Sequence, residues 1–300
     1  MSFDADSLGI PRASTRLLRD LIHERLGLYF GDDRLDQLAD RLAPVLVQRG
    51  FGSLLDYYYL LKYDTEADAE WRRVMDALAV NETYFWREID QIRAVAAVVL
   101  PRLVEQAAGR ALQIWSAPCA SGEEPLTIAM VLEEAGWFAR APIRIIGSDA
   151  SPAAVEKARR GHYTSRSFRN LPERLRDRYF HKIGEEWRVS DAIHGRITWD
   201  IVNLQNPAEV ARWGASPIVF CRNVFIYFSD TSIRRTVDLL SGSMPAGGYL
   251  CVGAAESLLR ITNRFDLQEI GGAFMYVHRG SAEPTVTTAA PDHGTVRWNA

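Results

Sequence analysis

The sequence predicts an α/β protein with a doubly wound, mostly parallel sheet, preceded by a small all-α domain. Two observations support this prediction. Up to about residue 80, apolar residues recur every three or four positions, which is the period of helices that bury one face. From residue 111 onward, short apolar runs alternate with helical stretches, which is typical of parallel strands joined by crossover helices.

The N-terminal part is expected to hold at least four helices. Apolar side chains make one helical face within residues 17–26 and another within residues 35–46. Residues 54–61 and 71–78 supply two more faces of the same kind. Pro44 lies inside the second pattern and is expected to kink or shorten that helix, because proline has no amide hydrogen to donate.

The strands of the sheet are expected where short apolar runs are bounded by turn residues. Helical stretches after Glu123, Ser151 and Asp230 separate most of these runs, as crossover connections require. The last run is expected to return as a strand at the edge of the sheet. The runs are residues 111–116, 143–149, 196–202, 217–221, 248–253 and 273–278.

Composition excludes several classes of function. The net charge of -3 over 300 residues gives no global basic field, so nucleic acid is not expected as a partner. No apolar run approaches the roughly 20 residues of a membrane span, and the N-terminus lacks signal-peptide character, so we expect a cytoplasmic protein without membrane insertion. The cysteines Cys119, Cys221 and Cys251 lack metal-ligand spacing, so free buried thiols and no metal are expected.

Ligands of a doubly wound sheet bind at the carboxyl ends of its strands, and unusual residues collect there. The turn S-A-P-C-A-S-G-E-E-P (116–125) follows the first strand, and Asp149, a candidate acceptor for ribose hydroxyls, ends the second. Neither G-x-G-x-x-G nor G-x-x-x-x-G-K-[ST] is present, which disfavours dinucleotide and phosphate binding. A nucleotide site without phosphate-binding groups suits S-adenosylmethionine, whose ammonium Glu124 is placed to meet.

Further candidates lie in two other stretches. In A-V-N-E-T-Y-F-W-R-E (79–88), Asn81 or Thr83 caps a helix end or lines a pocket, and Arg87 is suited to a carboxylate of cofactor or substrate. After the third strand, Asn203 and Leu204 are placed for the edge and face of an adenine.

Taken together, these stretches resemble the CheR family of chemoreceptor glutamate methyltransferases. The matching pieces fall in order over residues 13–280, nearly the whole chain. They are N-E-T-Y-F-W-R-E (81–88), W-S-A-P-C-A-S-G-E-E-P (115–125), S-D-A-S (148–151), E-K-A-R-R-G-H-Y (156–163), R-Y-F (178–180), V-N-L (202–204) and F-C-R-N-V-F-I-Y-F (220–228).

The resemblance implies a helical domain over 1–80, an interdomain segment over 81–110 and a methyltransferase domain over 111–280 with a small β-subdomain inserted at about 161–196. Residues 281–300 are expected to be a disordered tail or linker. The implied activity is S-adenosyl-L-methionine-dependent methylation of glutamate carboxylates on cytoplasmic chemoreceptor helices by a monomer, with Arg87 and Tyr227 as catalytic residues. The implied cofactor contacts are Asn81, Thr83, Arg87, Glu124, Asp149, Asn203, Leu204, Arg222 and Asn223.

The sequence also departs from the family pattern. The late turn G-A-A-E-S (253–257) has lost a polar group, and Ser121 and Leu126 replace commoner residues. The second helix keeps mainly Arg34, Arg41 and Arg49 of the basic face that family members often use for receptor docking, so the receptor is expected to differ. The connection H-K-I-G-E-E-W-R-V (181–189) is short and holds one glycine, which predicts a tight turn and a methyltransferase that does not need the tethering pentapeptide of some receptors.

Two other functions remain open from the sequence. One is an S-adenosylmethionine-binding scaffold without turnover, against which the presence of Arg87 and Tyr227 argues. The other is a methyltransferase for a small carboxylic acid. Comparing methylation of a receptor peptide with that of free acids separates this second alternative from the chemoreceptor function.

Overall fold

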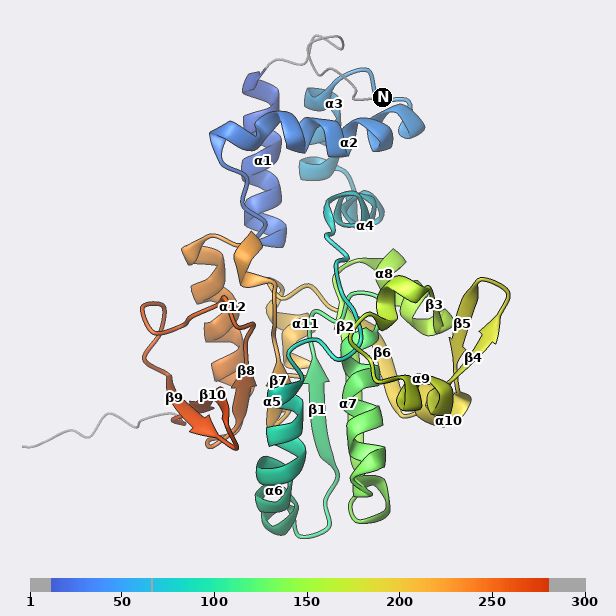
Figure 1. The fold of residues 1–300 in the computed structure, drawn as a ribbon. Coiled ribbons are helices and arrows are strands. Elements are labelled where there is room, and N and C mark those ends of the chain that lie inside the picture. Colours follow the sequence, from blue (N-terminus) through green and yellow to red (C-terminus); the bar gives the residue numbers. More distant parts are fainter. Residues whose placement is uncertain (1–11, 66, 281–300) are drawn as a thin grey trace, which may run out of the picture.

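The computed structural model describes residues 12–65 and 67–280, so the tail expected at 281–300 lies outside the described residues. An N-terminal helical domain stands at the top of Figure 1 and has its own apolar core, with Leu18, Leu38 and Val74 among its fully buried residues. Its elements are α1 (Arg12–Leu26), η2 (Asp32–Arg34), α2 (Leu35–Arg49), α3 (Leu54–Tyr63) and α4 (Ala67–Leu78).

Helix α2 continues through Pro44 to Arg49, so the expected shortening of this helix is wrong. Pro44 is exposed, and Asp40, one turn earlier, whose carbonyl loses its hydrogen-bond donor, is an exposed residue as well. The helix ends instead at Gly50, whose positive φ of 74° suits a glycine cap.

The connection to the sheet is itself helical. Helix α5 (Ile89–Ala94), the π-helical turn η3 (Val95–Val99) and α6 (Leu100–Ala107) follow one another without a break. Outside the insertion, the larger domain continues with β1 (Leu112–Ser116), α7 (Glu123–Glu134), η4 (Trp137–Ala139), β2 (Ile143–Asp149), α8 (Pro152–Arg160), β6 (Ile197–Ile201), α11 (Pro207–Ala211), β7 (Ile218–Phe220), η6 (Phe225–Tyr227), α12 (Asp230–Ser243), β8 (Tyr249–Cys251), β9 (Phe265–Ile270) and β10 (Ala273–His278).

The main sheet has seven strands in the order β6-β2-β1-β7-β8-β10-β9. The strands from β6 to β8 are parallel to one another, and β10 is antiparallel to both β8 and β9. The six predicted strands are confirmed, but the expectation that residues 273–278 form the edge is wrong, because β9 pairs with their outer side. The strand order reverses direction between β1 and β7, which is where doubly wound sheets bind ligands.

Successive residues of the central strands point to opposite faces of the sheet and supply two separate apolar cores. In β1, for example, Ile114 belongs to the core under α5 to α7, and Trp115 belongs to the core under α11 and α12. Both side chains are fully buried. The sheet is therefore covered on both faces, which holds the carboxyl ends of its parallel strands in fixed positions.

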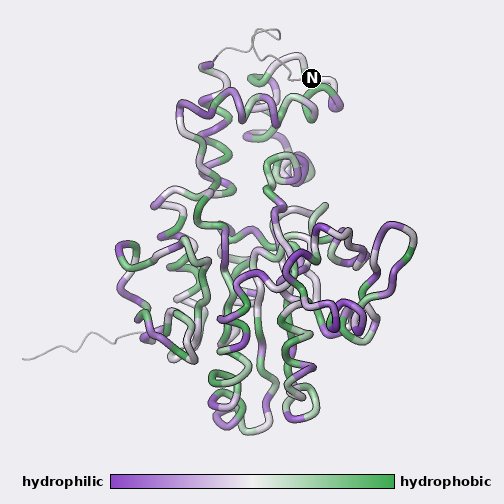
Figure 2. Tube along the Cα trace, viewed as in Figure 1, coloured by the Kyte–Doolittle hydropathy of each residue, from purple (hydrophilic) through white to green (hydrophobic). Residues whose placement is uncertain are grey.

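A small subdomain is inserted between α8 and β6 and lies at the right of Figure 1. Its three-stranded antiparallel sheet has the order β3-β5-β4, and a two-residue turn with Gly184 at a φ of 61° joins β4 to β5, as predicted. Figure 2 shows stretches of hydrophilic residues along this subdomain. Its elements are β3 (His162–Tyr163), η5 (Ser165–Phe168), α9 (Glu173–Tyr179), β4 (Phe180–Ile183), β5 (Glu186–Val189) and α10 (Asp191–His194).

The helices of the described residues are too short or too polar to cross a lipid bilayer.

Candidate functional site

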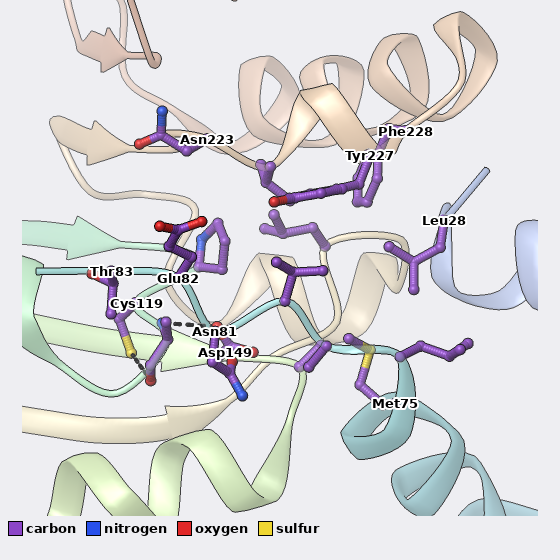
Figure 3. Close-up of a pocket in the computed structure, with 18 of the residues that line it drawn as sticks. Leu28, Met75, Asn81, Glu82, Thr83, Cys119, Asp149, Asn223, Tyr227 and Phe228 are labelled. Atoms are coloured by element: carbon purple, nitrogen blue, oxygen red, sulfur yellow. Dashed lines mark hydrogen bonds between the residues drawn. The ribbon is translucent and has the colours of Figure 1, made fainter. Parts of the chain in front are cut away.

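A pocket lies beyond the carboxyl ends of β1, β2, β6 and β7, where the helical domain meets the sheet. Figure 3 shows Leu28 and Met75, from the helical domain, around the same space as Asp149 and Tyr227. Every residue that the sequence proposes for the site lines this one pocket. These residues are Asn81, Thr83, Arg87, Glu124, Asp149, Asn203, Leu204, Arg222, Asn223 and Tyr227.

Asp149 is the last residue of β2, and its carboxylate is held by backbone amides. Its Oδ2 accepts a hydrogen bond from the Ala120 amide, and its Oδ1 accepts one from the Ser151 amide, both at 2.9 Å. Burial raises the pKa of this carboxyl, and the two amides act in the opposite direction because they favour the charged form. A carboxylate has about four lone-pair sites, so Asp149 keeps acceptors for a pair of ribose hydroxyls.

The turn after β1 brings the backbone close to this carboxylate. The Cys119 amide donates to the carbonyl of Ser148, which ties the turn to the end of β2. Gly122 closes the turn with a φ of 95°, and a Cβ there would lie 2.8 Å from the Trp199 ring. Only glycine fits both the backbone conformation and the space, so Gly122 lets the turn pack closely against Trp199.

Glu124 and Arg222 form a buried ion pair at the centre of the strand ends. Arg222 Nε lies 2.6 Å from one oxygen of Glu124, and the Ser116 hydroxyl donates to the other oxygen at 2.7 Å. Burial is the largest single influence and acts to lower the pKa of Arg222, but the charge of Glu124, the hydrogen bond to it and the charge of Glu88 together outweigh burial, so the pKa is raised. Arg222 therefore stays charged, and the Glu124 carboxyl group keeps lone pairs that can face an ammonium.

Arg222 also holds the backbone segment that contains Arg87 in place through hydrogen bonds. Its guanidinium donates to the backbone carbonyls of Arg87 and Glu88 at 3.1 and 2.9 Å. The Glu88 side chain accepts hydrogen bonds from the Asn223 amide group and the Ala254 backbone. Trp86 and Glu88 both have positive φ values, so this segment is an ordered turn and not a simple helix end.

The position of the Arg87 side chain is set from within the same turn. Its Nη1 donates to the carbonyl of Glu82 at 3.0 Å, and its guanidinium lies 5.7 Å from the centre of the Tyr84 ring. About a quarter of the side chain is exposed. The other donors of the guanidinium are available to a carboxylate in the pocket.

The loop after β7 holds Asn223 and Tyr227, and Glu256 fixes its backbone. The carboxylate of Glu256 accepts the amides of Asn223, Phe225 and Gly253, each at 2.7 Å. The sequence reasoning missed this role, although it noted the turn that contains Glu256. The local sequence, a single glutamate after two alanines, does not indicate that the Glu256 carboxylate binds the backbone of another loop.

Asn203 is already bonded within the protein. Its Nδ2 donates to the carbonyl of Arg25 at 2.8 Å, and its Oδ1 accepts the amide of Gln205 at 2.9 Å. One amide hydrogen and one lone pair remain for a ligand. Asn203 therefore joins the helical domain to the strand ends as well as lining the pocket, a contact that no local sequence pattern indicates.

The helical domain supplies the other wall of the pocket, which the sequence reasoning had not assigned to the site. The amide of Tyr29 donates to the carbonyl of Tyr227 at 2.8 Å, so the loop after α1 sits against the loop that holds Tyr227. Arg34 and Arg41, expected on a receptor-docking face, line the pocket. Arg49 does not line the pocket, and its Nε lies 2.8 Å from the buried carboxylate of Glu70.

Comparison with known proteins identifies the family of the chain. The family profile of the CheR methyltransferase SAM-binding domain matches residues 81–272, and the profile of the CheR methyltransferase all-alpha domain matches residues 13–79. The chain belongs to the CheR methyltransferase family. S-adenosylmethionine is the cofactor of this CheR domain. The pocket offers carboxylate acceptors, on Asp149 and Glu124, of the kind that ribose hydroxyls and an ammonium require.

Individual relatives of this CheR chain align over most of its length. Chemotaxis protein methyltransferase 2 of Vibrio cholerae is 33% identical over 88% of this chain and 93% of that protein. Chemotaxis protein methyltransferase 1 of Pseudomonas aeruginosa is 31% identical over 88% of this chain and 97% of that protein. The probable biofilm formation methyltransferase WspC of Pseudomonas putida is 32% identical over 90% of this chain and 63% of that protein.

Proposed function

We propose that this chain, acting as a cytoplasmic monomer, methylates glutamate side-chain carboxylates on the cytoplasmic region of a bacterial chemoreceptor or a chemoreceptor-like signalling protein. The observation that supports this most is the meeting of Arg87 and Tyr227, from two different segments, in one pocket with the proposed cofactor contacts. Membership of the CheR family and the names of the chemotaxis and biofilm methyltransferases support the same class of substrate.

The proposed reaction does not require the protein to act as a strong general acid or base. A glutamate carboxylate has an ordinary pKa of about 4.3, so it is already an anionic nucleophile at neutral pH. When bound, S-adenosylmethionine supplies an electrophilic methyl group, whose bond to sulfur breaks as the bond to a carboxylate oxygen forms. No proton is transferred, so alignment of the carboxylate and exclusion of water are the protein's main contributions, and orientation can supply several kcal/mol.

We assign Arg87 to holding the incoming carboxylate through its remaining N–H groups. The charge-assisted fork of an arginine suits this task, and the bond to the Glu82 carbonyl fixes its direction. We assign Tyr227 to orienting the carboxylate or the methyl group. We assign Asp149 to the ribose, Glu124 to the ammonium and the residues Asn81, Thr83, Asn203, Leu204, Arg222 and Asn223 to the remaining cofactor contacts.

Transfer of a labelled methyl group to purified chemoreceptor cytoplasmic fragments tests this proposal. The product should be an alkali-labile ester, and free small carboxylic acids should accept little label. Arg87→Ala should remove most turnover while the fold survives. Cofactor binding without any transfer by the wild type would favour a silent scaffold, and transfer to free acids alone would favour a small-acid methyltransferase.

We further propose that methylation does not require a receptor's C-terminal pentapeptide. The two-residue turn between β4 and β5 supports this, because it leaves no lengthened loop to shape an acceptor edge for an added strand. A synthetic pentapeptide should show no binding in calorimetry, and a tail-deleted receptor should be methylated at an undiminished rate. Micromolar binding of the pentapeptide at the inserted subdomain would overturn this part of the proposal.

A further inference from the structure

Two arginines of the inserted subdomain lie beside the segment that carries Arg87. The side chains of Arg166 and Arg169 are 79% and 42% exposed. Both approach the same oxygen of Glu82, at 4.0 and 3.8 Å, and Glu82 lines the pocket. These distances are too long for hydrogen bonds, so Glu82 neutralises the pair only weakly.

The subdomain is firmly attached at this point. The amide of Phe85 donates to the carbonyl of Ser167 at 2.9 Å, and the Phe85 ring stacks on Phe168 with centroids 5.3 Å apart. Phe85 is fully buried. The positions of Arg166 and Arg169 relative to Arg87 are therefore fixed by packed core residues and not by a loose loop.

Tyr84 connects the two sets of arginines. The Arg169 guanidinium lies 3.8 Å from the centre of the Tyr84 ring, and the Arg87 guanidinium lies 5.7 Å from the same centre. Stacking on an aromatic ring uses the flat face of a guanidinium and leaves its N–H groups directed outward. Arg169 is thus oriented by Tyr84 while its donors stay available.

Other arginines of the same subdomain are used differently. Arg174 and Arg178 each lie 2.7 Å from Glu134, and Arg188 lies 2.9 Å from Asp191. By contrast, within residues 12–65 and 67–280 no side-chain hydrogen bond is donated by Arg166 or Arg169. Two arginines held beside Glu82, a residue that lines the pocket, with unused donors are suited to binding a carboxylate from outside the chain.

We propose that Arg166 and Arg169 form a second carboxylate subsite, which binds an acidic side chain next to the glutamate that is methylated. The inference rests on the proposed function and extends it to the choice of glutamate. Glu82 stands in for the substrate carboxylate until the receptor binds and displaces it. The inserted subdomain thereby selects receptor glutamates that have an acidic neighbour on the same helical face.

The test uses a receptor cytoplasmic fragment whose accepting glutamate has such an acidic neighbour. The double variant Arg166→Ala/Arg169→Ala should lose about tenfold in kcat/KM through a higher KM, with kcat at saturation unchanged. Changing the acidic neighbour to glutamine should lower the kcat/KM of the wild type by a similar factor, but it should hardly lower the kcat/KM of the double variant any further. Glu82→Gln should lower the KM of the unchanged fragment, because it removes the internal competitor.

A charge exchange and a matched control sharpen this test. Arg169→Glu should recover activity on a fragment that carries lysine at the neighbouring position. Arg188→Ala, which removes an exposed charge from the same subdomain, should leave the KM unchanged. If the losses from the double arginine variant and from the glutamine substitution simply add, the subsite is overturned while the proposed function stays intact. Equal wild-type KM values for the fragments with the acidic and the glutamine neighbour would have the same consequence. A wild type that methylates no receptor fragment would overturn both.

Discussion

The two walls of the pocket differ in how their charged groups are held. On the sheet side, Asp149 and Arg222 are more than nine-tenths buried, and their charges are bonded at 2.6 to 2.9 Å. On the helical side, Arg34 and Arg41 bond only to neutral oxygens, and no carboxylate of the described residues forms an ion pair with either. The sheet wall is organised before ligand arrives, whereas the helical wall keeps positive charge for an anionic partner.

The largest expected effect comes from breaking the sheet wall. Arg222→Ala leaves Glu124 without its counter-charge, and loss of one partner of a buried ion pair costs about 3–5 kcal/mol of unfolding free energy. Chemical denaturation should show this loss. Arg279→Ala, which removes an exposed arginine paired with Asp266, is the control and should change stability little. Equal effects of the two variants would show that the walls do not differ in this way.

Removing the proposed ribose acceptor should have the next largest effect. Asp149→Ala should weaken binding of S-adenosylmethionine by about 1.5–3 kcal/mol, the usual contribution of hydrogen bonds to a charged group. Calorimetry should give one site per chain for the wild type. Asp76→Ala, which removes a carboxylate that bonds Ser151 and Ala153 but does not line the pocket, should bind the cofactor with nearly wild-type affinity.

A smaller effect is expected at Tyr227. Tyr227→Phe removes only a hydroxyl, so kcat should fall by about tenfold or less, corresponding to roughly one hydrogen bond. Steady-state kinetics on a receptor fragment would measure it, and the cofactor dissociation constant should stay unchanged. A loss as large as that of Arg87→Ala would mean that Tyr227 does more than orient the reacting groups.

The smallest effect is expected on the helical wall. Arg34→Ala should raise the KM for a receptor fragment a few-fold without changing cofactor binding, because an exposed charge contributes little. The effect should shrink at high salt, where exposed charges are screened. Arg49→Ala, which removes an arginine bonded to Glu70 outside the pocket, is the matched control and should leave the KM unchanged. An unchanged KM in Arg34→Ala would argue that the helical wall does not contact the receptor.

The sequence predicted the helices and strands that have a local apolar pattern. Strand β9 was missed because Leu267, Gln268 and Glu269 are exposed at the sheet edge, and only its ends, Phe265 and Ile270, are buried. A strand with so few buried residues leaves no apolar run. The interior position of β10 follows from pairing with β9, which local sequence cannot indicate.

In the site, sequence motifs predicted which residues meet but not what holds them. Glu256 accepts hydrogen bonds from four backbone amides of two loops, and Asn203 donates to the carbonyl of Arg25, far away in the chain. Such contacts join side chains to backbone groups that only the folded chain brings close to them. Neither the spacing nor the type of these residues distinguishes them from ordinary surface polar groups.

The central claim is that the pocket directs methyl transfer to a receptor glutamate. Mass spectrometry of a receptor cytoplasmic fragment, after incubation with the wild-type chain and S-adenosylmethionine, tests this claim most directly. The account predicts one added methyl group on individual glutamate side chains, lost on alkaline treatment and absent with Arg87→Ala. Methyl groups on another residue type, or an unmodified fragment in the presence of bound cofactor, would contradict it.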